Sequence, residues 1–194
     1  MVTAAEQGRD TRARLMDAAV AMIEERGWGA VTTRMVAERA GVRAGLVHYH
    51  FRSVDDLLID AALRTVRGLV GSVAGAAMRD PGAGIAALLA SVAEFDHAAA
   101  ENRVFSEILL AATRHDRLRV GLATVLTEFR ATLTEWLRTE TTVADPEATA
   151  VVLVAALDGL VLHRLIDPHI RALDTAGPLR RLTGVQTVPA LEAS

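Results

Sequence analysis

The fold of this chain can be inferred from the stretch "AGVRAGLVHYHFRSVDDLL" (residues 40–58). It combines a glycine turn, two histidines around a tyrosine, an arginine and a helix start, in a chain otherwise rich in alanine and leucine. With residues 32–39 before it, the stretch predicts two short helices joined by a turn that contains Gly41. This is the layout of a helix-turn-helix, in which the second helix enters the major groove of DNA.

Side-chain type separates an inner from an outer face of these two helices. Five apolar side chains are expected to face inward and to fix the angle between the helices: Val36, Ala37, Ala40, Val42 and Val47. The others point outward and are candidates for DNA contact: Arg43, Ala44, Gly45, Leu46, His48, Tyr49, His50 and Arg52. Arg43 can donate two hydrogen bonds to a guanine edge or a phosphate, and Leu46 can touch a thymine methyl group. For Tyr49 and His50, a partly buried structural role at the helix end is an equal alternative.

The whole chain is predicted to be all-α, with about nine helices, because apolar residues recur at helical spacing and no strand-type alternation is present. Helix starts are predicted at capping residues: Thr32 or Thr33, Ser53, Asn102, and Asp145 followed by Pro146. Gly27 is expected to end the first helix in a left-handed C-cap. We expect a linker over residues 79–84, a break at Gly177-Pro178 in the last helix, and a disordered tail over residues 185–194.

Composition narrows the class of protein. The 194 residues include no cysteine, which excludes a disulfide scaffold and a thiolate metal site and fits a reducing compartment. Residues 1–52 carry eight arginines against six acids, and the remainder thirteen against eighteen, which weakly favours an anionic partner for the first segment. The most apolar stretch, residues 150–166, contains charged residues and is shorter than the ~20 residues of a membrane span. We therefore expect a cytoplasmic protein, a buried helix at 150–166 and no membrane contact.

Enzyme motifs are not apparent in the sequence. Glu94 and His97 form one E-x-x-H pattern, whereas a di-iron bundle needs two copies with further glutamates. No nucleophile elbow, phosphate loop or H-E-x-x-H zinc motif is present. We expect neither catalysis nor a cofactor. The alternative to a DNA-binding protein is a helical adaptor that binds a protein partner.

The stretch "ERGWGAVTTRMVAERAGVRAGLVHYHFRSVDDLL" (residues 25–58) resembles the TetR family of bacterial transcriptional regulators. In that family a helix ends at a glycine followed by an aromatic residue, and a helix-turn-helix, a Tyr-His-Phe-Lys/Arg stretch and a capped helix follow. The resemblance implies a homodimeric repressor that binds a double-stranded DNA operator and is released by a small-molecule effector. It also implies a DNA-binding domain over residues 1–52 and an effector-binding and dimerisation domain over residues 53–184.

By the same resemblance, Thr33 and Arg34 match positions that contact the DNA backbone, and residues 43–46 match the base-reading start of the recognition helix. The phosphate-side positions are matched by His48, Tyr49, His50 and Arg52. At Ala44, Leu46 and Val54 the sequence departs from the polar residues common in the family. The operator sequence therefore cannot be transferred from relatives.

The body of the chain is expected to form both a dimer interface and an effector pocket. Residues 148–166 are apolar nearly all round, which predicts burial on more than one side, either inside the monomer or against a second copy. The interface candidates are Val151, Ala155, Ala156, Gly159 and Leu162. The apolar pocket candidates, for any one of which a plain core role is favoured over ligand contact, are Met78, Leu88, Val92, Phe95, Phe105, Leu109, Phe129, Trp136 and Leu160. The polar candidates are Asp158, His163, Glu107 and His97. This lining favours a hydrophobic effector.

Overall fold

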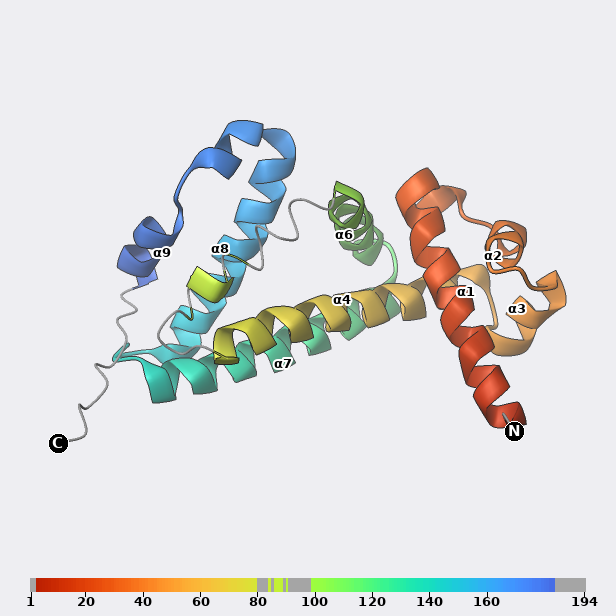
Figure 1. The fold of residues 1–194 in the computed structure, drawn as a ribbon, viewed down its shortest axis with the longest axis horizontal. Helices are drawn as coiled ribbons and strands as arrows, with labels where there is room; N and C mark the ends of the chain where they lie inside the picture. Colours follow the sequence, from red (N-terminus) through yellow and green to blue (C-terminus); the bar gives the residue numbers. More distant parts are fainter. Residues whose placement is uncertain (1–2, 80–83, 85, 89, 91–98, 184–194) are drawn as a thin grey trace. The chain divides into compact units, whose positions relative to one another are not determined.

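The computed structural model describes residues 3–79, 84, 86–88, 90 and 99–183. These residues form helices joined by short turns and contain no β-strand, so the all-α prediction is confirmed. Figure 1 labels the α-helices. In chain order the elements are α1 Ala4–Arg26, η1 Trp28–Ala30, α2 Thr33–Arg39, α3 Ala44–His50, α4 Val54–Arg79, α6 Ala99–Ala112, α7 Asp116–Glu140, α8 Pro146–Ile166, η3 Pro168–Ala172 and α9 Ala176–Thr183. The predicted Glu94-His97 pattern, most of the 79–84 linker and the 185–194 tail lie outside the described residues.

Side-chain caps set three of the predicted helix starts. The Thr32 hydroxyl accepts from the Met35 N–H at 3.3 Å, and the Ser53 hydroxyl accepts from the Asp56 N–H at 3.0 Å. Asp145 accepts from the N–H of Ala148 at 3.0 Å, with Pro146 in the first helical position. Each cap satisfies one of the N–H groups that the first turn of a helix leaves without a partner.

α1 ends at Gly27 as predicted, but the conformation of this cap and two other predicted boundaries are wrong. Gly27 does have a positive φ of 76°, but its ψ of 158° is not left-handed helical, because the chain extends there before entering η1. α6 is already helical at Ala99, so Asn102 does not start it; alanine favours the helix on the N-terminal side of Asn102. The last break falls at residues 173–175, not at Gly177-Pro178, which lies in the first turn of α9, where a missing N–H is tolerated.

The chain divides into two compact units. The first comprises Met1–Arg67 and Arg103–Leu122, so α6 and the start of α7 pack together with the N-terminal helices. Within it, α2 packs on both α1 and α3. The largest fully buried side chains of this unit are Leu15, Ile23, Val36, Val47, Leu57, Leu58, Ile108 and Leu118. Leu15, Ala19, Met22 and Ile23 of α1 lie in this core at the helical spacing that the sequence predicts.

The second unit comprises Gly68–Asn102 and Ala123–Ser194. Here α8 packs against η3 and α9. One face of α8 is buried, with Leu153 and Leu157 at 0 and 5 % exposure, whereas Val152 on the opposite side is 53 % exposed. The expectation that α8 is buried on more than one side is therefore not met within one chain. Among the described residues, one stretch, Pro146–Arg164, is long and apolar enough to cross a membrane, although length and composition alone are weak evidence for a span.

Candidate nucleic-acid interface

The turn between α2 and α3 is fixed by backbone hydrogen bonds. Gly41 has a φ of 67°, a conformation that glycine adopts without a steric penalty. Its N–H donates to the Glu38 carbonyl at 3.1 Å, and the N–H of Val42 donates to the Ala37 carbonyl at 3.0 Å. These two bonds form a Schellman motif, which ends α2 and turns the chain directly into α3.

Small and branched side chains lock α3 onto the rest of the helix-turn-helix. Val36, Ala37 and Val47 are at most 2 % exposed, as expected for inward residues. Ala40 and Val42, which were expected to be inward as well, are half-buried at the edge of the contact. The apolar contact thus leaves α3 a single orientation relative to α2, a condition for reading base edges.

The outer face of α3 is open to solvent. Arg43, Ala44, Gly45, Leu46 and His48 are all exposed. Tyr49 is 80 % exposed, so it is not a partly buried helix-end residue, whereas His50 is half-buried. The rings of Tyr49 and His50 meet edge to face with centroids 5.0 Å apart. At the flanks, Arg34 and Arg52 are exposed and Thr33 is half-buried.

The charged residues in and around α3 are basic. Residues 39–52 contain three arginines and two histidines but no aspartate or glutamate. Arg39 is paired with Glu25 of α1 at 2.8 Å. Arg34, Arg43 and Arg52 have no ion pair among the described residues, and their guanidinium groups can therefore bind phosphates or base edges. An acid-free, exposed helix face of this kind suits a polyanion.

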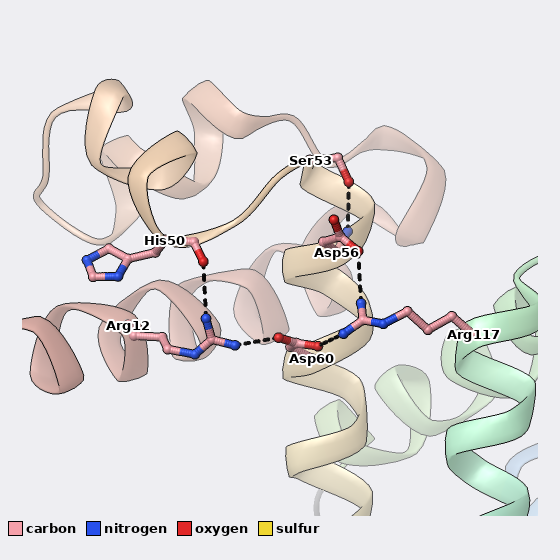
Figure 2. A network of polar contacts seen from close by, with 6 residues as sticks. All are labelled: Arg12, His50, Ser53, Asp56, Asp60 and Arg117. Atoms are coloured by element: carbon pink, nitrogen blue, oxygen red, sulfur yellow. Dashed lines mark hydrogen bonds and ion pairs between the residues drawn. The ribbon is translucent and has the colours of Figure 1, made fainter.

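A polar network lies behind the interface, at the end of α3 (Figure 2). Arg12 of α1 donates to the carbonyl oxygen of His50 at 3.1 Å and pairs with Asp60 of α4. Asp60 also pairs with Arg117 of α7, which reaches Asp56 at 2.9 Å. The sequence did not predict this position of Arg12 at the end of α3. One signal was available: Arg12 stands three and seven residues before Leu15 and Ala19, in line with the buried stripe of α1.

The predicted pocket residues fall into different units. Phe105, Leu109 and Glu107 belong to the first unit, where the Glu107 carboxylate accepts from the Trp28 N–H at 2.7 Å. The second unit holds Leu88, Phe129 and Trp136, all buried, together with the half-buried Asp158 and Leu160 and the exposed His163. The side chains of Met78, Val92, Phe95 and His97 lie outside the described residues. The structure therefore does not gather the predicted set within one unit.

Two groups of the second unit are unusual in their burial. The indole Nε1 of Trp136 is buried and has no hydrogen-bond partner among the described residues. Burial also raises the pKa of the Asp158 carboxyl from 3.8 to about 6. Unpaired buried donors and desolvated carboxyls are costly, so both groups are candidates for contact with a ligand.

The predicted interface residues lie along α8. Val151, Ala155 and Leu162 are exposed, and Ala156 and Gly159 are half-buried. A Cβ atom added at Gly159 would meet nothing within 4 Å, so packing inside the chain does not require glycine there. An apolar stripe with small residues thus faces outward from this helix.

Comparison with known proteins identifies both parts of the chain. Residues 15–61 match the family model described as bacterial regulatory proteins, tetR family, and residues 79–186 match that of the tetracyclin repressor-like C-terminal domain. The transcriptional regulator BetI of Rhizobium meliloti is 31% identical over 157 residues, which cover 79% of this chain and 77% of BetI.

Solved structures of other transcriptional regulators are similar to this chain over most of its length. A TetR family member from Streptomyces coelicolor, SCO1917, is 29% identical with a TM-score of 0.70 and covers 90% of this chain and 96% of that one. A transcriptional regulator of Rhodococcus, RHA1_ro04179, is 25% identical with a TM-score of 0.71 and covers 92% and 99%. The α2–turn–α3 unit with its exposed arginines, the helical body and these matches together establish that the chain belongs to the TetR family of bacterial DNA-binding transcriptional regulators.

Proposed function

We propose that this regulator is a cytoplasmic homodimeric repressor that binds a double-stranded operator through α3 of each protomer and is released by a small hydrophobic effector. The observation that carries the proposal is the outer face of α3, which is exposed and free of carboxylates, while the inner face is packed on α2 through buried Val47. Phosphate contacts supply most of the affinity of such a surface, and base contacts supply its specificity.

The exposed side chains divide by position. Residues 43–46 begin the recognition helix, and the early residues of such helices reach base edges. Among them, Arg43 is the residue suited to a guanine edge, and Leu46, 39 % exposed, to a thymine methyl group. The phosphate contacts are assigned to Thr33, Arg34, His48, Tyr49, His50 and Arg52.

The dimer is proposed to form through α8. Val151, Ala155 and Leu162 recur at i, i+4 and i+11, so they lie along one helical stripe, and Val151 is 46 % exposed. Ala156 and Gly159 leave room beside this stripe for the helix of a second copy. A two-fold axis would pair the same surface on both protomers, the commonest arrangement of soluble oligomers.

The effector site is proposed in the second unit. Phe129 and Trp136 offer apolar surface, the Trp136 Nε1 offers a donor, and Asp158 offers a carboxyl whose pKa is near 6. A mainly apolar molecule that carries one hydrogen-bond acceptor fits this set, because binding sites of this kind combine an apolar lining with a few polar groups.

DNA binding can be tested by fluorescence anisotropy on a duplex selected from a random library with the wild-type protein. We expect specific binding that falls steeply with salt and is lost or relaxed in Arg43→Ala. If the protein selects no duplex and instead retains a protein partner, the helical adaptor remains the better description.

A further inference from the structure

We propose that Arg12 is a positioning residue for DNA recognition: it holds the C-terminal end of α3 and, through Asp60, ties that end to α4 and α7. This inference rests on the proposed role of α3 as the recognition helix. It concerns a residue of α1 that lies behind α3 and has its guanidinium occupied by protein groups.

One guanidinium holds both the last residue of α3 and the residue after it. The carbonyl of His50 belongs to the last turn of α3, where carbonyls have no partner within the helix. Arg12 donates its Nη1 hydrogen to this carbonyl at 3.1 Å. The same guanidinium carbon lies 4.3 Å from the centroid of the Phe51 ring, and Phe51 is only 4 % exposed. A cation above a buried aromatic face adds to the hydrogen bond, so the end of α3 cannot swing freely.

Asp60 is shared between two arginines from different helices. Its Oδ2 pairs with Nη2 of Arg12, and its Oδ1 pairs with Nη2 of Arg117. The second Arg117 nitrogen, Nη1, reaches the Oδ1 of Asp56 at 2.9 Å, and the backbone N–H of Asp56 donates to Ser53. Figure 2 shows this chain of contacts running from α3 through α1 and α4 to α7. The side chain of Asp60 is 21 % exposed, the lowest value of the four charged partners, as suits its place between them.

Open space beside the polar network allows its side chains to change partners. His50, Phe51, Arg52, Asp56, Asp60 and Arg117 line a hollow of about 310 Å³. Arg117 is 52 % exposed at its side chain, so it is not held by packing on all sides. A displacement of Arg117 alters the partners of Asp60, and Asp60 in turn holds the guanidinium that fixes α3. Because α7 continues from Asp116 to Glu140, Arg117 stands at the start of a helix that enters the second unit.

The charge of Asp60 provides a test that separates positioning from direct DNA contact. Asp60→Asn removes a negative charge from a DNA-binding unit, and electrostatics alone would tighten its binding to DNA. If Asp60 instead orients Arg12, the same change must weaken binding, because the Arg12 fork loses its ionised partner. The two mechanisms therefore predict effects of opposite sign.

The experiment measures anisotropy of the library-selected duplex at several salt concentrations. We expect Arg12→Ala and Asp60→Asn each to weaken binding roughly 5–30-fold, the factor that a lost charge-assisted hydrogen bond represents. The double variant should be hardly weaker than the poorer single variant, since both changes break one unit. Arg12→Lys keeps the charge but not the planar fork, and should fall between Arg12→Ala and wild type. Arg14→Ala is the control, because Arg14 lies on the same helix and, within the described part of the chain, forms an ion pair only with the exposed Asp10.

Three results would overturn the inference: tighter or unchanged binding by Asp60→Asn, a salt slope reduced by about one in Arg12→Ala, or equal losses in Arg14→Ala and Arg12→Ala. Circular dichroism spectra and Tm values identify a variant that does not fold; should Arg12→Ala fail, Asp60→Asn and Arg12→Lys carry the same test. A different measurement, on the Arg43→Ala variant, tests the proposed function itself. If Arg43→Ala binds every duplex as wild type does, α3 is not the recognition helix, whatever the Asp60 variants do.

Discussion

The carboxylate of Glu107 in α6 accepts a hydrogen bond from the backbone N–H of Trp28, 79 residues earlier, at 2.7 Å. The carboxylate also lies against Gly27, where an added Cβ would come within 3.3 Å of its Oε2. Trp28 is 8 % exposed, and its ring centroid lies 5.6 Å from that of His115. The Glu107 carboxylate therefore links the turn after α1 to α6, beside the buried indole ring of Trp28.

This contact predicts different effects for two substitutions of Glu107. Glu107→Ala leaves the part-buried N–H of Trp28 without a partner and should lower the free energy of unfolding by about 1–3 kcal/mol. Glu107→Gln keeps an acceptor oxygen and should lose less. Urea unfolding measures both, with Glu135→Ala as a control, because the exposed Glu135 has its one ion pair among the described residues with Arg138, one turn away. Equal losses in the alanine and glutamine variants would contradict the assignment.

Helix positions were predictable where one local cause decides them. Thr32, Ser53 and Asp145 cap their helices through contacts three residues away, so the sequence pattern contains the whole cause. The predicted break at Gly177-Pro178 was wrong because a different local contact sets the start of α9. The Asp174 side chain accepts from the Ala176 N–H at 3.0 Å and sets the start of α9 just before this pair, which the first turn then tolerates.

The network behind α3 was not predictable, because its partners are distant in sequence. Arg12 and Asp60 are 48 residues apart, and Arg117 and Asp60 are 57 apart. The spacing of residues in the sequence predicts which face of a helix each residue lies on. It does not predict which other helix packs against that face. The exposed face of α3 could be predicted, since it needed only the assignment of Val47 as inward.

The three exposed arginines of the candidate interface should differ in their effect on specificity. We expect Arg34→Ala and Arg52→Ala to weaken binding to all duplexes alike and to lower the salt slope by about one each. Arg43→Ala should in addition relax preference at one base pair, at a cost of ~1–3 kcal/mol against the best duplex. Anisotropy on a set of single-base operator variants measures this difference. Even losses across the set for Arg43→Ala would exclude a base-reading role.

The α8 stripe should be required for the dimer. Ala155→Glu places an unpaired charge in the middle of the proposed interface and should give monomers, since such a buried charge costs several kcal/mol. Light scattering measures the mass in solution. Ala123→Glu makes the same change at an exposed alanine of α7 and serves as the control. A dimer that persists in Ala155→Glu would place the interface elsewhere.

The raised pKa of Asp158 predicts a loss of stability as pH rises. The protonated carboxyl is favoured in the folded state, so its contribution is full below about pH 4 and is lost as pH passes through about 6. Relative to Asp158→Asn, which does not titrate, the wild type should lose about 2–3 kcal/mol of unfolding free energy between pH 4 and pH 7. Urea unfolding at each pH tests this, with Glu147→Gln on the same helix as an exposed control. Parallel pH profiles for wild type and Asp158→Asn would refute it.

Release by an effector should appear as a coupling free energy between ligand and DNA. Two recognition helices must stand roughly 34–36 Å apart to enter successive major grooves, so a shift of a few ångströms loses one half-site. α4 runs unbroken from Val54, next to the candidate interface, to Arg79 in the second unit, and like α7 it is an element that can carry such a shift. An effector can move the balance only by its differential affinity for the two states, typically a factor of about 5–150. Operator DNA must then weaken effector binding by that same factor.

Calorimetric titration of an effector found by thermal-shift screening, with and without saturating operator duplex, measures the factor directly. Equal affinities in the two titrations would mean that the ligand does not release the protein from DNA, and tighter binding with operator present would make it a co-repressor.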